Sequence, residues 1–297
     1  MRDQDTSLGH RWQMRRLFEG HPYGRPSLGT PETIGAMGRE DCQTFYRDNF
    51  YRNGSLAAGC GDLEEGRLQA LGTATVGCLP EGSLEASEVP DTAPTPGWKI
   101  TLVDKPARSQ TQVFMGHTSI DAFHPDRPPL SLGNVVFGGT FTSRLSQEIR
   151  EKRGWSYGAS SQLFGDRHVG MLGMRFAPEP RNTRDAIAIA GEMMEELGAR
   201  GVTEEELEAA RAHLVLGHPM GVETPQAELR ARAADHLLGR PPGWLDGEVE
   251  RLQAITHEQV QEALTFAQVK LHQQRQKAEI NRLLRVIKKK VKIKSLP

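Results

Sequence analysis

A single stretch, residues 137–161, constrains the fold of this chain more than any other part of it. It reads FGGTFTSRLSQEIREKRGWSYGASS. The double glycine, Gly138 and Gly139, interrupts regular structure, and we expect it to meet a need for positive φ in a turn. The residues after this turn have helical periodicity, and the end of the stretch is typical of a strand. The stretch therefore predicts a turn, a helix, a second turn and a strand in succession.

The helix within this stretch has recognisable start and stop signals. Thr142 or Ser143 is placed to cap its N-terminus, and Gly154 is placed to end it. Arg150 lies near the end of the helix, and Tyr157 lies just beyond the glycine. We therefore expect the arginine and the tyrosine on either side of a helix-to-strand corner.

The pattern Gly-Gly, S-R-L, R-E and G-x-x-Y resembles the second-domain signature of the pitrilysin/insulinase metallopeptidases, whose active half carries an inverted H-x-x-E-H zinc motif. In that family the arginine and tyrosine reach an active site held by a different domain or subunit. The resemblance implies that Arg150 and Tyr157 bind peptide substrate, and that the Tyr157 hydroxyl donates to the oxyanion in trans. Gly138 and Gly139 are the matching glycines of this substrate-binding segment.

Residues 21–34 and 39–63 resemble the closing part of the family's first, zinc-binding domain. In the family, H-x-x-E-H and a further glutamate ligand lie upstream of these strings. The sequence as given begins after the last expected ligand, so the resemblance implies a truncated member with no metal site of its own and with zinc in a partner half. His213 and His218 do not replace the motif, because residues five apart on a helix do not share a face.

The resemblance and the local composition together divide the chain into four segments. We expect a remnant of the zinc-binding domain in 1–62, a linker rich in Gly, Glu, Pro, Ser and Thr in 63–98, the C-terminal peptidase-family domain in 99–266, and a basic tail in 267–297. In the third segment the expected strands come first and the helices follow. This order predicts an α+β fold with helices packed on one face of a sheet, preceded by a partial domain of the same type.

Local signals predict the borders of several elements. Strands are expected at 55–59, 98–103, 110–116 and 170–176, the last of them buried and central, and helices at 11–19, 39–49 and 130–137. Helix caps are expected at Thr30, Thr183, Thr203 with Glu206, Thr224, and Thr256 with Gln259. The helix at 39–49 should turn Cys42, Phe45 and Tyr46 inward, yet the remnant lacks the elements that would cover it and should expose apolar surface.

Composition narrows the cellular setting only in part. The net charge of −1 gives no general attraction to nucleic acid, so we do not expect a nucleic-acid partner. The 3 cysteines form no C-x-x-C pair and suggest no disulfide framework. No apolar run is long enough for a transmembrane segment, and the start as written is no signal peptide. The localisation stays open: cytoplasmic as written, periplasmic or extracellular if the true N-terminus is longer.

The segment 267–297 is rich in lysine and arginine and contains one acidic residue, Glu279. Such a segment is typical of a solvated terminal helix or a disordered end. Contact with nucleic acid or an anionic membrane is a second interpretation. A shifted reading frame or a fusion is a third, because the family resemblance stops near residue 267.

We interpret the chain as the non-zinc half of a metallopeptidase-family protein, inactive alone. It would bind unfolded peptide and stabilise the transition state for a subunit or domain that carries H-x-x-E-H, as in a heterodimer. Two alternatives remain open. One is a non-catalytic peptide-binding or scaffold protein, and the other is a nucleic-acid or membrane-surface binder that uses the basic tail.

Overall fold

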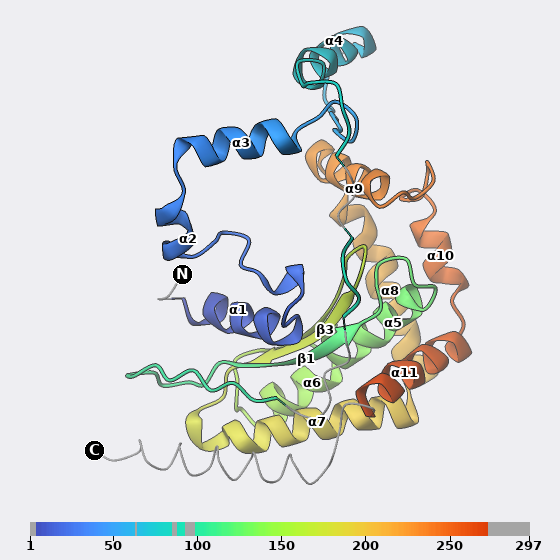
Figure 1. Cartoon of the computed structure of the whole chain (residues 1–297). Helices are drawn as coiled ribbons and strands as arrows, with labels where there is room; N and C mark the ends of the chain where they lie inside the picture. The colour runs from blue at the N-terminus through green and yellow to red at the C-terminus, as the bar shows by residue number, and fades with distance from the viewer. Residues whose placement is uncertain (1–3, 63, 85–87, 93–98, 273–297) are drawn as a thin grey trace. The chain divides into compact units, whose positions relative to one another are not determined.

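Figure 1 shows the computed structural model, which describes residues 4–62, 64–84, 88–92 and 99–272. The chain separates into two compact units, each built from segments that are distant in sequence. The first unit takes its described residues from 1–25, 90–214 and 252–272, and the second takes them from 26–89 and 215–251. The predicted segments are contiguous, and their borders stay a prediction.

The first unit is built on a three-stranded antiparallel sheet in the order β1-β3-β2. Its strands are β1 Val113–Ser119, β2 Ala159–Gly165 and β3 Gly170–Phe176. Gly173 of β3 lies opposite Gly116 on one side and Gln162 on the other. The prediction of a buried central strand at 170–176 is confirmed, whereas the strand expected at 110–116 begins at Val113 instead.

Two other predicted strands are wrong. Residues 55–59 and the described part of 98–103 contain no strand. A strand needs a neighbouring strand to receive its backbone hydrogen bonds, and neither segment pairs with one. Near the first of them, Asn53 makes an isolated bridge to Ser83. The alternating pattern of these segments was therefore not sufficient to form a sheet.

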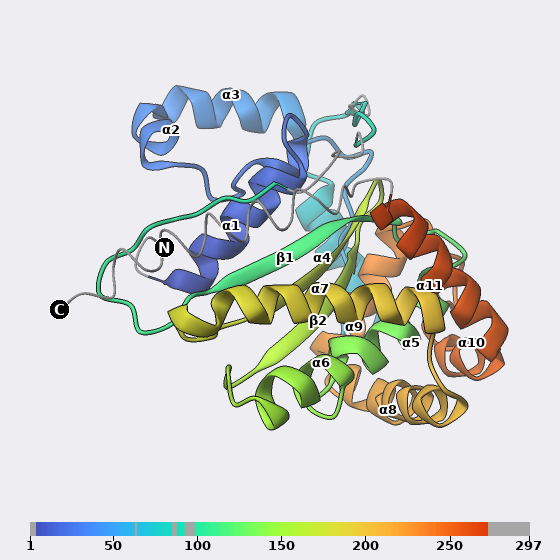
Figure 2. The same cartoon turned by 90° about the horizontal axis from the view of Figure 1, so that it is seen from below.

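Helices lie on both faces of the sheet (Figures 1 and 2). One face is covered by the helical layer α5 Arg127–Asn134, α7 Thr183–Arg200 and α11 His257–His272. The apolar stripe of α7 is buried, including Ala186, Ala190 and Leu197. This layer confirms the predicted α+β fold with helices on one face of a sheet.

Helix α1, Asp5–Leu17, lies against β1 on the opposite face of the sheet. Gln13 Nε2 donates to the Met115 carbonyl at 2.9 Å. Phe18, just after the helix, is 3% exposed and packs with Val169 and Met171. The helix predicted at 11–19 therefore exists, but it begins earlier and is part of the first unit.

Two of the helix caps predicted in the first unit are confirmed, and a third is wrong. Thr203 and Glu206 form a capping box at the start of α8, Glu204–Gly221, with reciprocal bonds of 2.8 and 3.2 Å. Thr256 and Gln259 do the same before α11. Thr183 is not the cap of α7, because Asn182 holds that position. The first unit also contains the short helices η1 Pro22–Gly24 and η4 Pro180–Asn182, and α10 Glu248–Ala254 has residues in both units.

The second unit is helical in its described residues. It contains α2 Pro31–Ala36, α3 Arg39–Asn49, α4 Glu65–Val76 and α9 Pro225–Leu237. The caps predicted at Thr30 and Thr224 are confirmed, and α3 has the predicted bounds. Helix α4 lies within the stretch predicted as a linker, so that stretch is partly helical.

The prediction that Cys42, Phe45 and Tyr46 of α3 face inward is wrong. Phe45 is 61% exposed and Tyr46 is 51% exposed, and Cys42 is exposed as well. Their only described aromatic neighbours lie in the same segment, where the Tyr46 ring stacks on Phe50 at 5.0 Å. The companion prediction, that this part of the chain exposes apolar surface, is confirmed.

Two further predictions concern the basic tail and membrane-spanning segments. Residues 273–297, most of the basic tail, lie outside the described residues. In the described part of the chain, no helix is both long and apolar enough to cross a membrane.

Candidate functional site

The helix of the predicted corner, here called the corner helix, is α-helical at its start and π-helical beyond it, so most of it is wound more widely than an α-helix. It begins as α6 Arg144–Ser146 and continues as the π-helical segment η3 Gln147–Lys152. A second π-helical segment, η2 Val135–Gly139, ends at the double glycine before it. Such segments are rare and are found frequently at functional sites. The sequence predicted a helix here but gave no sign of its wider winding.

Gly138 is required by close packing and not by backbone conformation. Neither Gly138 nor Gly139 has positive φ, so that expectation was wrong. Gly138 is buried, and a Cβ added there would lie 2.6 Å from the Ser161 backbone nitrogen of β2. Ser161 Oγ in turn donates to Asn134 Oδ1 at 2.7 Å. Gly138 therefore lets the π-helical segment approach the sheet, while Gly139 is exposed.

The start of the corner helix is anchored to α8 by an ion pair. Arg144 Nε donates to Glu206 Oε1 at 2.7 Å, and a second guanidinium nitrogen donates to the Gly201 carbonyl at 3.0 Å. The hydrogen bond from Arg144 lowers the pKa of the Glu206 carboxyl and raises the pKa of the arginine. Leu145 and Ile149, both 0% exposed, fix the other side of the helix in the core. The ion pair and the two buried side chains therefore fix the corner helix against the rest of the first unit.

The end of the helix is shaped by Gly154 and a buried serine. Gly154 has φ +60, as its predicted role as the helix end requires. Ser156 is buried, donates to the Gly158 carbonyl at 2.6 Å, and accepts from the Ala177 backbone N–H at 2.9 Å. These bonds pin the loop beside β3 and leave Tyr157 86% exposed. The tyrosine hydroxyl is consequently free to meet a ligand from solvent.

The structure brings Arg150 and Tyr157 together, as the sequence predicted, and adds a third side chain. The Arg150 guanidinium carbon lies 5.7 Å from the Tyr157 ring centroid and 5.1 Å from that of Phe141. Both distances suit cation–π attraction. Arg150 also pairs with Glu151 at 2.9 Å. The Arg150 guanidinium therefore contacts two exposed aromatic rings, one before and one after the corner helix, which restricts the directions in which its N–H groups can point.

Phe141 was missed by the sequence analysis. It lies in the turn after Gly139, where Ser143 Oγ donates to the Thr140 carbonyl at 2.6 Å, and it is 70% exposed. Its sequence context gave no signal, because single exposed apolar residues are common on protein surfaces. Only the folded chain shows its contact with Arg150.

Metal ligands are not gathered at this corner or elsewhere in the described chain. Among the described residues, no three His, Cys, Asp or Glu side chains form a group that could hold a metal ion. His213 and His218 lie on α8 and belong to no such group. The described donor set therefore does not fit a zinc ion.

With this geometry in view, comparison with known proteins identifies the class. The chain belongs to the family described as the peptidase M16 inactive domain, whose model matches residues 36–214, more than half of the chain. The metallopeptidase resemblance inferred from Arg150, Tyr157 and their neighbours is thereby confirmed.

Curated relatives, most of them named as zinc proteases, are longer than this chain. An uncharacterized zinc protease of Mycobacterium leprae is 28% identical over 264 residues, which cover 88% of this chain and 59% of that protein. A protein of Helicobacter pylori named as a non-peptidase homolog is 24% identical over 252 residues, which cover 83% and 56%. The chain therefore spans about three fifths of the length of the relatives it matches.

Solved structures support the fold. A peptidase M16 inactive domain from Pseudomonas fluorescens has a TM-score of 0.81 and 25% identity, covering 89% of this chain and 62% of that one. A chain of complex III2 from Candida albicans has a TM-score of 0.76 and 16% identity, covering 88% and 63%. At the latter identity the likeness concerns the fold alone.

Proposed function

We propose that this protein is the half of a metallopeptidase that binds peptide and stabilises the transition state, and that it works with a subunit or domain carrying H-x-x-E-H. The observation that carries the proposal is the exposed cluster of Arg150, Phe141 and Tyr157 on a rigid corner. The family membership supplies the reaction class, peptide hydrolysis. The partner would carry the zinc, with the water that it activates.

The chemistry assigned to this chain is hydrogen-bond donation. Attack on a peptide carbonyl places negative charge on its oxygen, and the Tyr157 hydroxyl would donate to that oxyanion. The Arg150 guanidinium keeps its charge at any working pH and would hold a substrate carbonyl or chain terminus through its planar fork. The rings of Phe141 and Tyr157 would keep the fork in place. Glu151 would have to share Arg150 with the substrate.

Removing the hydroxyl oxygen of Tyr157 tests its proposed role. Tyr157→Phe keeps the ring that contacts Arg150 and removes only the hydroxyl. In a complex with the H-x-x-E-H subunit from the same source, we expect turnover of an unfolded peptide to fall about 10²–10³-fold, as it does when an oxyanion donor is lost. KM should change little, because the ring and the arginine remain.

The matched control is Tyr46→Phe, the same chemical change at another exposed tyrosine. It should leave turnover unaltered. If Tyr157→Phe also leaves turnover unaltered in an active complex, the oxyanion role is refuted.

One observation favours a second candidate function, a non-catalytic peptide-binding or scaffold protein. A relative from Helicobacter pylori is named as a non-peptidase homolog. In that case Arg150→Ala would weaken peptide binding by the isolated chain, and no partner would give turnover. The basic-tail alternative stays a prediction, since residues 273–297 lie outside the described structure.

A further inference from the structure

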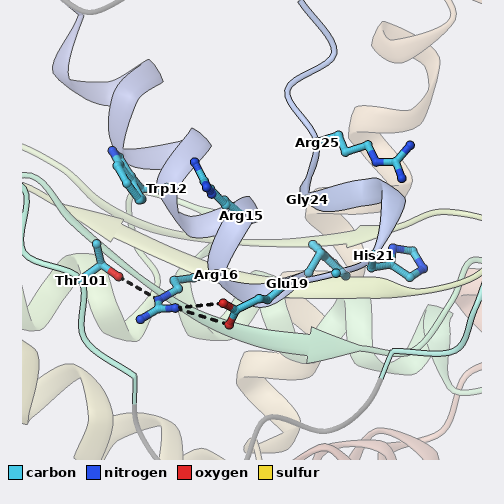
Figure 3. A pocket seen from close by; sticks show the side chains of 10 residues that line it. Trp12, Arg15, Arg16, Glu19, His21, Gly24, Arg25 and Thr101 are labelled. Carbon is cyan, nitrogen blue, oxygen red and sulfur yellow. Dashed lines mark hydrogen bonds and ion pairs between the residues drawn. The ribbon is translucent and has the colours of Figure 1, made fainter. Parts of the chain in front are cut away.

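A hollow with several charged lining residues lies at the end of helix α1, in a part of the first unit that the proposed function does not use (Figure 3). It has a volume of roughly 570 Å³. Its walls come from the last turns of α1, the turn that follows, and Thr101. This size falls within the range of small-ligand sites and exceeds that of a single ion.

The hollow is lined by more positive than negative charge. Arg15, Arg16 and Arg25 line it, and Glu19 is the only acidic lining residue. Arg16 donates to Thr101 Oγ1 at 3.1 Å and pairs with Glu19 at 3.4 Å. Figure 3 shows this group at one end of the view and Arg25 with His21 at the other. The positive charge therefore extends across the hollow.

Two of these arginines have no described carboxylate partner. The Arg15 guanidinium lies over the Trp12 ring, 5.6 Å from its centroid. Arg25, at the end of η1, makes no ion pair with any residue that the structure describes. An arginine that has no carboxylate partner and lies near an aromatic ring suits a ligand whose anionic group is attached to an apolar group.

His21 provides independent evidence for a ligand, because one of its buried donor groups has no described acceptor. It is 6% exposed, and its Nδ1 accepts the Tyr23 backbone N–H at 3.1 Å. That bond places the proton of the neutral ring on Nε2. The Nε2–H is buried and has no partner among the described residues, although the ring lines the hollow. A buried donor without an acceptor costs free energy that a ligand oxygen would recover.

We propose that this hollow binds a carboxylate carried by a peptide, with Arg25 and His21 as donors and Trp12 as the apolar wall. Arginine binds carboxylate and phosphate alike through its planar fork. The Trp12 ring suits an anion attached to an apolar group, as in a peptide, more than a free inorganic phosphate. Reaching His21 Nε2 requires a side-chain adjustment of the kind common on binding.

The test is calorimetric titration of the full chain with two peptides, acetyl-Phe-Glu-Ala-amide and the same peptide with glutamine. We expect the glutamate peptide to bind at least roughly tenfold more tightly, as charge-assisted hydrogen bonds would give. Arg25→Gln should remove this preference. His21→Phe keeps a ring against Tyr23, removes the Nε2–H together with the Nδ1 acceptor, and should weaken binding of the glutamate peptide severalfold.

The matched control is Arg11→Gln, the same charge change on α1 at a residue that does not line the hollow. It should retain the preference for glutamate. Equal binding of the two peptides would overturn the proposal, as would equal losses in Arg11→Gln and Arg25→Gln. Tighter binding of inorganic phosphate than of the glutamate peptide would overturn the choice of ligand. The measurement needs no peptidase partner, so its failure leaves the proposed function untouched.

Discussion

The corner helix of the first unit and helix α3 of the second unit have similar apolar patterns but different surroundings. In the corner helix Leu145 and Ile149 are both 0% exposed. In α3, Phe45 and Tyr46 are more than half exposed and contact Phe50 of the same segment. Periodicity decided which side of each helix is apolar, but burial required a second surface. The first unit provides that surface through its sheet and helical layer.

The largest expected effect is on stability and separates these two helices directly. Leu145→Ala should lower the free energy of unfolding by about 2–5 kcal/mol, because it leaves a cavity in a closed core. Phe45→Ala should change it by less than about 0.5 kcal/mol, since the ring is mostly solvated. Urea unfolding followed by circular dichroism measures both. Similar losses in the two variants would mean that α3 is covered in solution.

A smaller effect distinguishes the ion pairs of the two units. The Glu206 pKa is lowered by Arg144, so the pair stabilises the fold above the ordinary carboxyl pKa of 4.5 and loses this contribution as pH falls through the lower folded value. Glu206→Gln should cost about 1–2 kcal/mol at pH 7, from the charged hydrogen bonds. The difference from the unaltered protein should shrink below pH 4.5.

Asp246→Asn is the corresponding change in the second unit. Asp246 pairs with Arg232 at 2.8 Å, but its side chain is 60% exposed. Solvent screens such a pair, so this variant should have a much weaker effect than Glu206→Gln. A pH-independent loss in Glu206→Gln would show that packing, and not the charge, is what the substitution removes.

The smallest effect concerns helix caps. Thr256→Ala removes the side chain that accepts the Gln259 N–H, and should cost about 0.5–1 kcal/mol in thermal or urea unfolding. Thr30→Ala removes the same kind of cap from α2 in the second unit. Because α2 has no buried residue, its loss should not shift the main unfolding transition. A shift of equal size would indicate that the two units unfold together.

Much of the first unit could be predicted because its signals are local. The capping boxes at Thr203 and Thr256 satisfy backbone N–H groups within one turn, and strand β3 is apolar except at Arg175. The strand expected at 55–59 failed for the opposite reason. Its hydrogen bonds had to come from another strand, and its own residues could not specify one.

The residues of the candidate site were easier to predict from the sequence than their geometry. The spacing between Arg150 and Tyr157 around Gly154 placed both at one corner, and the structure brings them within cation–π distance. Phe141, the π-helical winding and the packing role of Gly138 depend on contacts with distant residues. No local pattern carried that information.

The sequence alone determined the helix starts, the central strand, the arginine and tyrosine of the corner, and the family to which they point. These features depend on backbone capping, side-chain periodicity and short spacings, all of which act within a few residues. Only the tertiary structure decided which apolar faces are buried, that Arg150 contacts two rings, and that His21 and Arg25 share a hollow. Burial and charge pairing depend on groups that the chain brings together from far apart, and those distances exist only after folding.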